Sequence, residues 1–147
     1  MKPVKRSELS TAEQDCLVQV EAALGNSYSP YSGLCVGAGI LLEDGKIVVG
    51  INYESASYGL TLCAERTAIA RAQAQGVALD TVGMIISARH SDAAKAPFNL
   101  TPCGACRQWI AELSKRTGRD FPVTCFWDGE ESGLQGSAQN LLPEAFL

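Results

Sequence analysis

The sequence lacks an excess of positive charge and any long apolar segment. Its 12 Lys and Arg residues stand against 16 Asp and Glu residues, so the formal net charge is −4 and no basic stripe is available to follow a phosphate backbone. The longest uncharged stretch, which includes residues 24–42, contains a turn-rich segment, and residues 1–9 are not followed by the apolar region of a secretory signal. We therefore expect no nucleic-acid partner, no membrane span and no export.

Histidine is scarce, whereas cysteine is not. His90 is the only histidine; it follows an expected strand in a polar loop, where a surface position is expected rather than metal ligation. Six cysteines without an export signal indicate a reducing compartment, for which the cytoplasm is the default. Cys16, Cys35 and Cys125 have no partner at ligand spacing, and we interpret them as small buried hydrophobic residues.

The chain has the size and composition of one compact domain, residues 1–147. Its 46% hydrophobic content can form a substantial core, and no repeat or linker divides it. Local patterns predict the order αββαβαβα, with helices packed on a mixed sheet. The expected helices cover residues 11–24, 63–75 and 103–115, with a short one near Leu141; the strands cover 36–42, 46–51, 82–88 and 123–127, and a polar loop covers 89–99.

The first chemical feature is the segment Pro102-Cys103-Gly104-Ala105-Cys106 at the start of the third expected helix. Two thiols three residues apart in a first helical turn can face one point, and the helix N-terminus favours their thiolate forms. The pair suits one half of a zinc site. A lone Cys-x-x-Cys segment could equally be a redox pair.

A second half-site lies at Cys63-Ala64-Glu65, again at the expected start of a helix. Three thiolates from Cys63, Cys103 and Cys106 would leave the fourth tetrahedral position of zinc open to water, as in catalytic sites, whereas structural sites are usually closed by four ligands. Glu65 lies two residues beyond its cysteine, where it could take a proton from that water and deliver it to a substrate.

These two segments together form the zinc deaminase signature in its three-cysteine form. The chain resembles the small, homotetrameric cytidine deaminase family over nearly its whole length, with matching segments at residues 29–32, 36–38, 52–54, 56–61, 63–68, 102–108 and 141–146. The resemblance implies an α/β fold of three layers, α-β-α, with a mixed five-stranded sheet. It also implies one Zn²⁺ per subunit and hydrolytic deamination of cytidine or deoxycytidine at C4, with Glu65 as the proton shuttle.

The resemblance assigns roles to further residues. Asn52 and Glu54 would hold the ribose 3′-hydroxyl, the Ala64 backbone N–H would contact the pyrimidine carbonyl, and the Thr101 carbonyl would face the departing amine. Arg66 would hydrogen-bond a zinc thiolate, which has a physical reason because three thiolates leave the site with net negative charge. Phe146 would reach the pocket of a neighbouring subunit and lie against the pyrimidine, so that the active sites are shared within the tetramer.

The chain departs from the family pattern at Leu34, Cys35 and Ser55. The family usually has Phe at the position of Leu34, which here makes a smaller pocket wall, and Asn at the position of Ser55. A cytidine modified at N4 or C5, or another aminopyrimidine nucleoside, is therefore an alternative substrate. A non-catalytic zinc module is a further alternative, although no spare cysteine or histidine is placed to close the fourth position.

Overall fold

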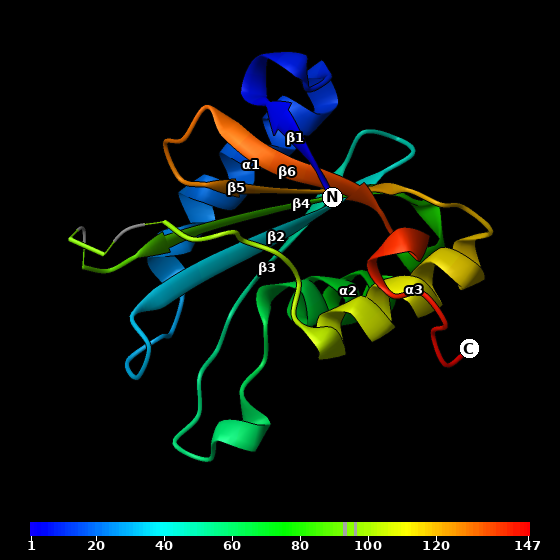
Figure 1. Ribbon diagram of the computed structural model, residues 1–147. Helices are drawn as coiled ribbons and strands as arrows, with labels where there is room; N and C mark the ends of the chain where they lie inside the picture. Colours follow the sequence, from blue (N-terminus) through cyan, green and yellow to red (C-terminus); the bar gives the residue numbers. More distant parts are fainter. Residues whose placement is uncertain (93, 96) are drawn as a thin grey trace.

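The computed structural model describes residues 1–92, 94–95 and 97–147, which form a mixed sheet covered by helices on both faces (Figure 1). The strand order is β1-β6-β5-β4-β2-β3; only β4 and β5 pair in parallel, and every other neighbouring pair is antiparallel. The strands are β1 (Lys2–Lys5), β2 (Leu34–Leu42), β3 (Ile47–Ile51), β4 (Thr81–His90), β5 (Pro122–Trp127) and β6 (Ser132–Ser137). The helices are α1 (Thr11–Ala23), α2 (Ala64–Ala74) and α3 (Gly104–Thr117).

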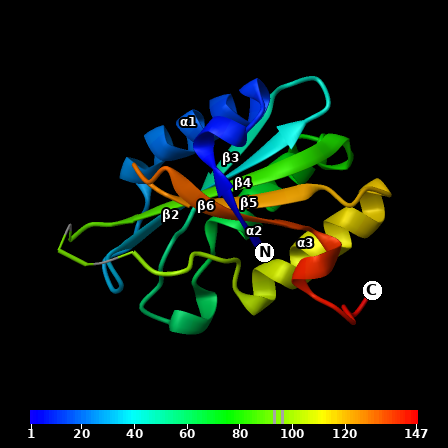
Figure 2. The ribbon, with the colours of Figure 1, turned by 45° about the horizontal axis from the view of Figure 1, so that its top comes forward.

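The three helices divide between the two faces of the sheet. Figure 2 shows α1 on one face and α2 and α3 on the other, and each face has its own buried cluster. Under α1 these are chiefly Cys16, Leu17, Val20, Ile85 and Phe126. The larger cluster lies between the sheet and the α2–α3 layer, which is also the side of the cysteine half-sites. The expected three-layer α-β-α fold is confirmed.

The expected sheet of five strands is wrong, because six strands pair in the described chain. Neither β1 nor β6 was predicted from local patterns. The sequence of β1, Lys-Pro-Val-Lys, is half charged and contains proline, and that of β6, Ser-Gly-Leu-Gln-Gly-Ser, is polar and rich in glycine. β1 is an edge strand of the sheet, and β6 lies between β1 and β5 and pairs with both.

The other elements lie close to their expected positions. Ser10 caps α1 through a capping box with Glu13, as its sequence predicts. The hairpin turns at Gly45, whose φ of +81° suits glycine. The short terminal helix is a single 3-10 turn, Gln139–Leu141. The expected loop at 89–99 begins later, after His90 ends β4, and its residues 93 and 96 lie outside the described part of the chain.

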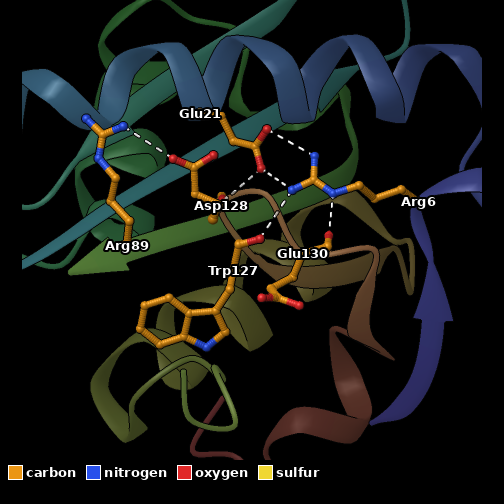
Figure 3. Close-up of polar contacts among 7 residues, drawn as sticks. Arg6, Glu21, Arg89, Trp127, Asp128 and Glu130 are labelled. Carbon is orange, nitrogen blue, oxygen red and sulfur yellow. Dashed lines mark hydrogen bonds and ion pairs between the residues drawn. The ribbon is translucent and has the colours of Figure 1, made fainter. Parts of the chain in front are cut away.

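The N-terminal segment is held by a polar network on the α1 side (Figure 3). The Arg6 guanidinium forms a two-point ion pair with Glu21 of α1, and it also donates to the carbonyl groups of Trp127 and Glu130. Its planar group lies 5.3 Å from the centre of the Phe126 ring. These contacts join the start of the chain to α1 and to the turn between β5 and β6.

No helix within residues 1–92, 94–95 and 97–147 has the length and apolar character needed to cross a membrane.

Candidate metal centre and pocket

Two helix starts bring the three predicted ligands together. Cys63 precedes α2 and Cys103 precedes α3, each with extended backbone angles, and neither thiol caps its own helix. Cys106 lies in the first turn of α3 and is fully buried. The Sγ atoms of Cys63, Cys103 and Cys106 all lie within 4.8 Å of one another.

The spacing of the sulfur atoms fits zinc. The Sγ atom of Cys103 lies 3.7 Å from that of Cys63 and 3.5 Å from that of Cys106. Tetrahedral ligands with Zn–S bonds of about 2.3 Å stand about 3.8 Å apart. The separations are also far longer than the S–S bond of a disulfide, about 2.0 Å. All six cysteines are free thiols in the structure. The donor set and its geometry therefore support a zinc site.

Within the cluster, the surroundings favour the thiolate form of Cys63, whereas hydrogen bonding with Cys63 and burial raise the pKa of the Cys106 thiol. Hydrogen bonding from the Cys106 thiol, together with Cys103 and the Arg66 guanidinium, lowers the pKa of Cys63 to about 5 in spite of burial. The Arg66 Nη2 atom donates to the Thr61 carbonyl over 2.8 Å, and its Nε atom is buried with no hydrogen-bond partner in the described part of the chain. Arg66 thus lies beside the cluster, and its positive charge acts on the Cys63 sulfur.

Glu65 is the buried carboxyl group of this centre. It is the second residue of α2, its side chain is only 4% exposed, and burial raises its pKa to about 7. The first N–H groups of a helix have no acceptor within the helix, so the Ala64 and Glu65 amides are available at the same point. Cys63, Cys103 and Glu65 share one pocket, with a volume of about 310 Å³.

The opposite end of the pocket is polar, and its side chains are oriented by hydrogen bonds. The Asn52 Oδ1 atom accepts from the Ser27 hydroxyl and from the Val36 N–H, and its Nδ2 atom donates to the Leu34 carbonyl over 2.8 Å. Because an amide group has two N–H bonds, one remains for a ligand. Asn52 is 7% exposed, and it lines the pocket with Glu54.

Glu54 is fixed by the turn before β2. One of its carboxylate oxygens accepts from the backbone N–H groups of Tyr31, at 2.9 Å, and Ser32, at 3.2 Å, while the other accepts from the Ser32 hydroxyl. Burial raises the pKa of Glu54, but these hydrogen bonds outweigh it and leave the pKa below the ordinary value. Glu54 is therefore an ionised acceptor with a set orientation.

Most of the predicted site residues come together in this pocket. Its lining includes Leu34, Asn52, Glu54, Cys63, Glu65, Thr101 and Cys103. Phe146 does not line it: this side chain is 90% exposed near the C-terminus. Among the three departures from the family pattern, only Leu34 lines the pocket. Cys35 lies with its sulfur 3.4 Å from the Ser29 hydroxyl, and Ser55 accepts a hydrogen bond from the Ser57 N–H.

The lining also includes residues to which the sequence assigned no role: the apolar Val36, Leu62, Ile86, Phe98 and Leu100, and the hydroxyl-bearing Ser32 and Thr61. Ser32 stands within a segment that resembles the family, so its position could have been noticed. Phe98 comes from the loop after β4, in which no local pattern marks a pocket residue. His90 was expected at the surface, and this was wrong: it ends β4, is half-buried, and its ring stacks on Trp127 with centroids 5.4 Å apart.

Comparison with known proteins agrees with this geometry. The family model described as the cytidine and deoxycytidylate deaminase zinc-binding region matches residues 10–118, which include Cys63, Cys103 and Cys106 of the metal centre. A cytidine deaminase of Halalkalibacterium halodurans is 48% identical over 120 residues, which are 82% of this chain and 83% of the relative. A probable cytidine deaminase of Dictyostelium discoideum is 35% identical over 133 residues, 90% of this chain and 82% of the relative.

A solved structure has the same fold. The crystal structure of cytidine deaminase from Burkholderia pseudomallei superimposes with a TM-score of 0.78 at 33% sequence identity, covering 94% of this chain and all of the other. The family match, the relatives and the three-cysteine centre lead to the same conclusion: the chain belongs to the cytidine and deoxycytidylate deaminase family.

Proposed function

We propose that this protein is a zinc-dependent enzyme that hydrolyses the C4 amino group of free cytidine or deoxycytidine, giving a uridine-type nucleoside and ammonia. One observation carries the proposal: the three-thiol cluster and the buried Glu65 share a pocket with the oriented polar pair Asn52 and Glu54. The volume of about 310 Å³ is at the small end of ligand pockets and suits a single nucleoside.

The metal end of the pocket supplies the hydrolytic chemistry. Zinc would be held by Cys63, Cys103 and Cys106, where it would act as a Lewis acid and lower the pKa of water. Glu65 would accept one proton from the attacking water and deliver it to N3 of the pyrimidine, and would then move the second proton, from the new C4 hydroxyl group, to the departing amine as the C4–N bond breaks. The Ala64 N–H would donate to the pyrimidine carbonyl from the start of α2. The Glu65 carboxyl group is buried and is therefore kept away from bulk solvent.

The polar end would hold the sugar. The remaining Asn52 N–H would donate to the 3′-hydroxyl, and Glu54 would accept from it. The three hydrogen bonds that Glu54 already accepts fix its carboxylate before a ligand arrives, which lowers the entropic cost of binding. Thr101, directly before the Pro102-Cys103 segment, would place its carbonyl beside the departing amine. Arg66 would offset part of the negative charge of three thiolates.

A substrate modified at N4 or C5 is the second candidate. The observation that favours it is Leu34, the one departing residue that lines the pocket. Comparing kcat/KM for cytidine and for an N4-substituted cytidine decides between the two. Efficient cytidine turnover without activity on the modified nucleoside would remove this candidate.

We further propose a cytoplasmic homotetramer of single-domain subunits, in which Phe146 completes the pocket of a neighbour. Its 90% exposure and its absence from the pocket of its own chain are in keeping with this role. The six free thiols suit a reducing compartment. Light scattering measures the assembly. Phe146→Ala should lower kcat/KM while the zinc content stays at the wild-type level, and unchanged kinetics would contradict the shared site.

The test of the proposed activity separates metal binding from proton transfer. Purified protein is analysed for zinc and assayed for ammonia release from cytidine and deoxycytidine. Glu65→Gln should keep its zinc but lose about 10²- to 10⁴-fold in kcat, because the amide cannot accept the proton. Cys106→Ala should lose the metal as well as the activity. Wild-type turnover by the Glu65→Gln protein would overturn the proton-transfer assignment.

A further inference from the structure

Phe98 is an aromatic wall of the pocket that the sequence did not reveal. The other described lining residues are aliphatic or polar, among them Leu34, Val36, Ile86 and Leu100, so Phe98 supplies the only aromatic side chain of this lining. A pyrimidine between the metal end and the polar end presents two flat faces. Aromatic side chains bind such faces more strongly than aliphatic ones of similar size.

The Phe98 ring is half exposed, yet it is held from behind. It packs edge-on against the Trp127 indole, with centroids 5.0 Å apart and an interplanar angle of 82°. The Trp127 Nε1–H also donates to the Phe98 carbonyl, so both the ring and the backbone of Phe98 contact the same side chain. The His90 ring stacks on Trp127 and also lies 6.1 Å from the Phe98 ring centre, and His90 pairs in register with Leu34 across β2 and β4.

Trp127 is itself fixed from the far face of the sheet. Its carbonyl accepts a hydrogen bond from Arg6, while its indole ring points away from the Arg6 network (Figure 3). The chain of contacts therefore runs from the N-terminal segment through Trp127 to Phe98. A ring positioned in this way loses little freedom when a ligand packs against it, so more of the contact energy appears as affinity.

Phe98 also lies between two hollows. It lines the pocket of about 310 Å³ and also a second cavity of about 420 Å³, which is bordered by Cys125, Trp127 and Leu134. Among the residues that the structure describes, Leu100 is the only other one common to the two linings. Phe98 thus separates the proposed base site from the space behind it and limits how large a base the pocket accepts.

We propose that Phe98 is a specificity-determining residue that contacts the pyrimidine ring of the bound nucleoside. This rests on the proposed function, since it assigns the pocket to a pyrimidine nucleoside. The contact acts on binding and leaves proton transfer to other groups, so removing the ring raises KM and leaves kcat nearly unchanged.

The experiment measures binding without turnover. Isothermal titration calorimetry with uridine, the proposed product, gives Kd for the zinc-loaded full chain and its variants. Phe98→Leu should raise Kd roughly three- to tenfold, and Phe98→Tyr, which keeps the ring, should stay within about twofold of wild type. Leu79→Ala is the control, because Leu79 is similarly exposed (52% against 50%) and does not line the pocket; its Kd should not change.

Two results would overturn the assignment: a Phe98→Leu protein that binds uridine as tightly as wild type, or a wild type that does not bind uridine. The proposed function is judged separately by ammonia release from cytidine. Wild-type protein that binds uridine through Phe98 but releases no ammonia would contradict the deaminase proposal alone. Wild-type protein that deaminates cytidine, with normal uridine binding by Phe98→Leu, would contradict the Phe98 assignment alone.

Discussion

At Gly50 of β3 the backbone of α2 lies directly against the sheet. A Cβ atom built there would stand 2.3 Å from the Ala68 nitrogen, 2.7 Å from the Ala64 carbonyl oxygen and 2.8 Å from the Ala68 Cα. These are all backbone atoms of α2, so no side chain can rotate out of the way. Because ordinary Cβ contacts begin near 3.4 Å, Gly50→Ala requires α2 to withdraw from the sheet by about 1 Å.

Two effects follow from that displacement. The free energy of unfolding should fall by about 1–3 kcal/mol, the usual cost of an extra methyl group in a closely packed site. Cys63 and Glu65 stand at the start of the same helix, so the shift also moves one ligand and the carboxyl group relative to Cys103 and Cys106 on α3. A misplacement of about 1 Å can cost about 10²-fold in rate. We therefore expect kcat/KM to fall by more than the loss of stability alone would suggest.

Urea unfolding, zinc analysis and cytidine turnover below the unfolding transition measure these effects. Gly59→Ala is the matched control, since Gly59 has negative φ and no atom lies within 4 Å of its added Cβ; both stability and turnover should stay at the wild-type level. A Gly50→Ala protein with the wild-type urea midpoint and wild-type kcat/KM would refute the argument that this contact positions the metal centre.

Two further predictions concern charged groups outside the metal centre. Arg6→Ala should lower the free energy of unfolding by about 2 kcal/mol, because it leaves the half-buried Glu21 without its ion-pair partner. As the control, Lys46→Ala removes an exposed ion pair and should barely move the urea midpoint. Equal shifts of the midpoint for both variants would contradict this prediction. The pKa of Glu54 is lower in the folded state than in the unfolded state. The ionised Glu54 carboxylate therefore stabilises the fold fully above the unfolded-state pKa, and this contribution is lost as the pH falls through the folded-state pKa. Glu54→Gln should thus be less stable than wild type at neutral pH, and in urea titrations the difference should close as the pH falls through the lowered folded-state pKa of Glu54; a pH-independent difference would argue against it.

The elements that the sequence predicted well are those with strong local patterns. The capping box at Ser10 marks the start of α1, and the apolar runs of β2, β4 and β5 are long enough to be recognised without tertiary information. Strand β1, at the edge of the sheet, and its neighbour β6 were missed because β6 is held by pairing with β1 and β5, β1 is held by pairing with β6, and the residues of both carry little strand preference.

The metal centre could be predicted from local sequence, whereas the aromatic wall of the pocket could not. Cys63 and Cys103 each precede a helix, and the direction of a side chain at such a position follows from local geometry, so their convergence could be anticipated. The rings of His90, Phe98 and Trp127 pack against one another. Trp127 is far from the other two in the sequence, so no periodic pattern predicts this contact. In the proposed mechanism, residues at helix starts would determine the reaction chemistry, while Phe98, in a loop that contacts Trp127, would form the aromatic wall of the pocket. Substitutions that change substrate preference should therefore concentrate at Leu34, Phe98 and the residues behind them, and can leave the zinc ligands untouched.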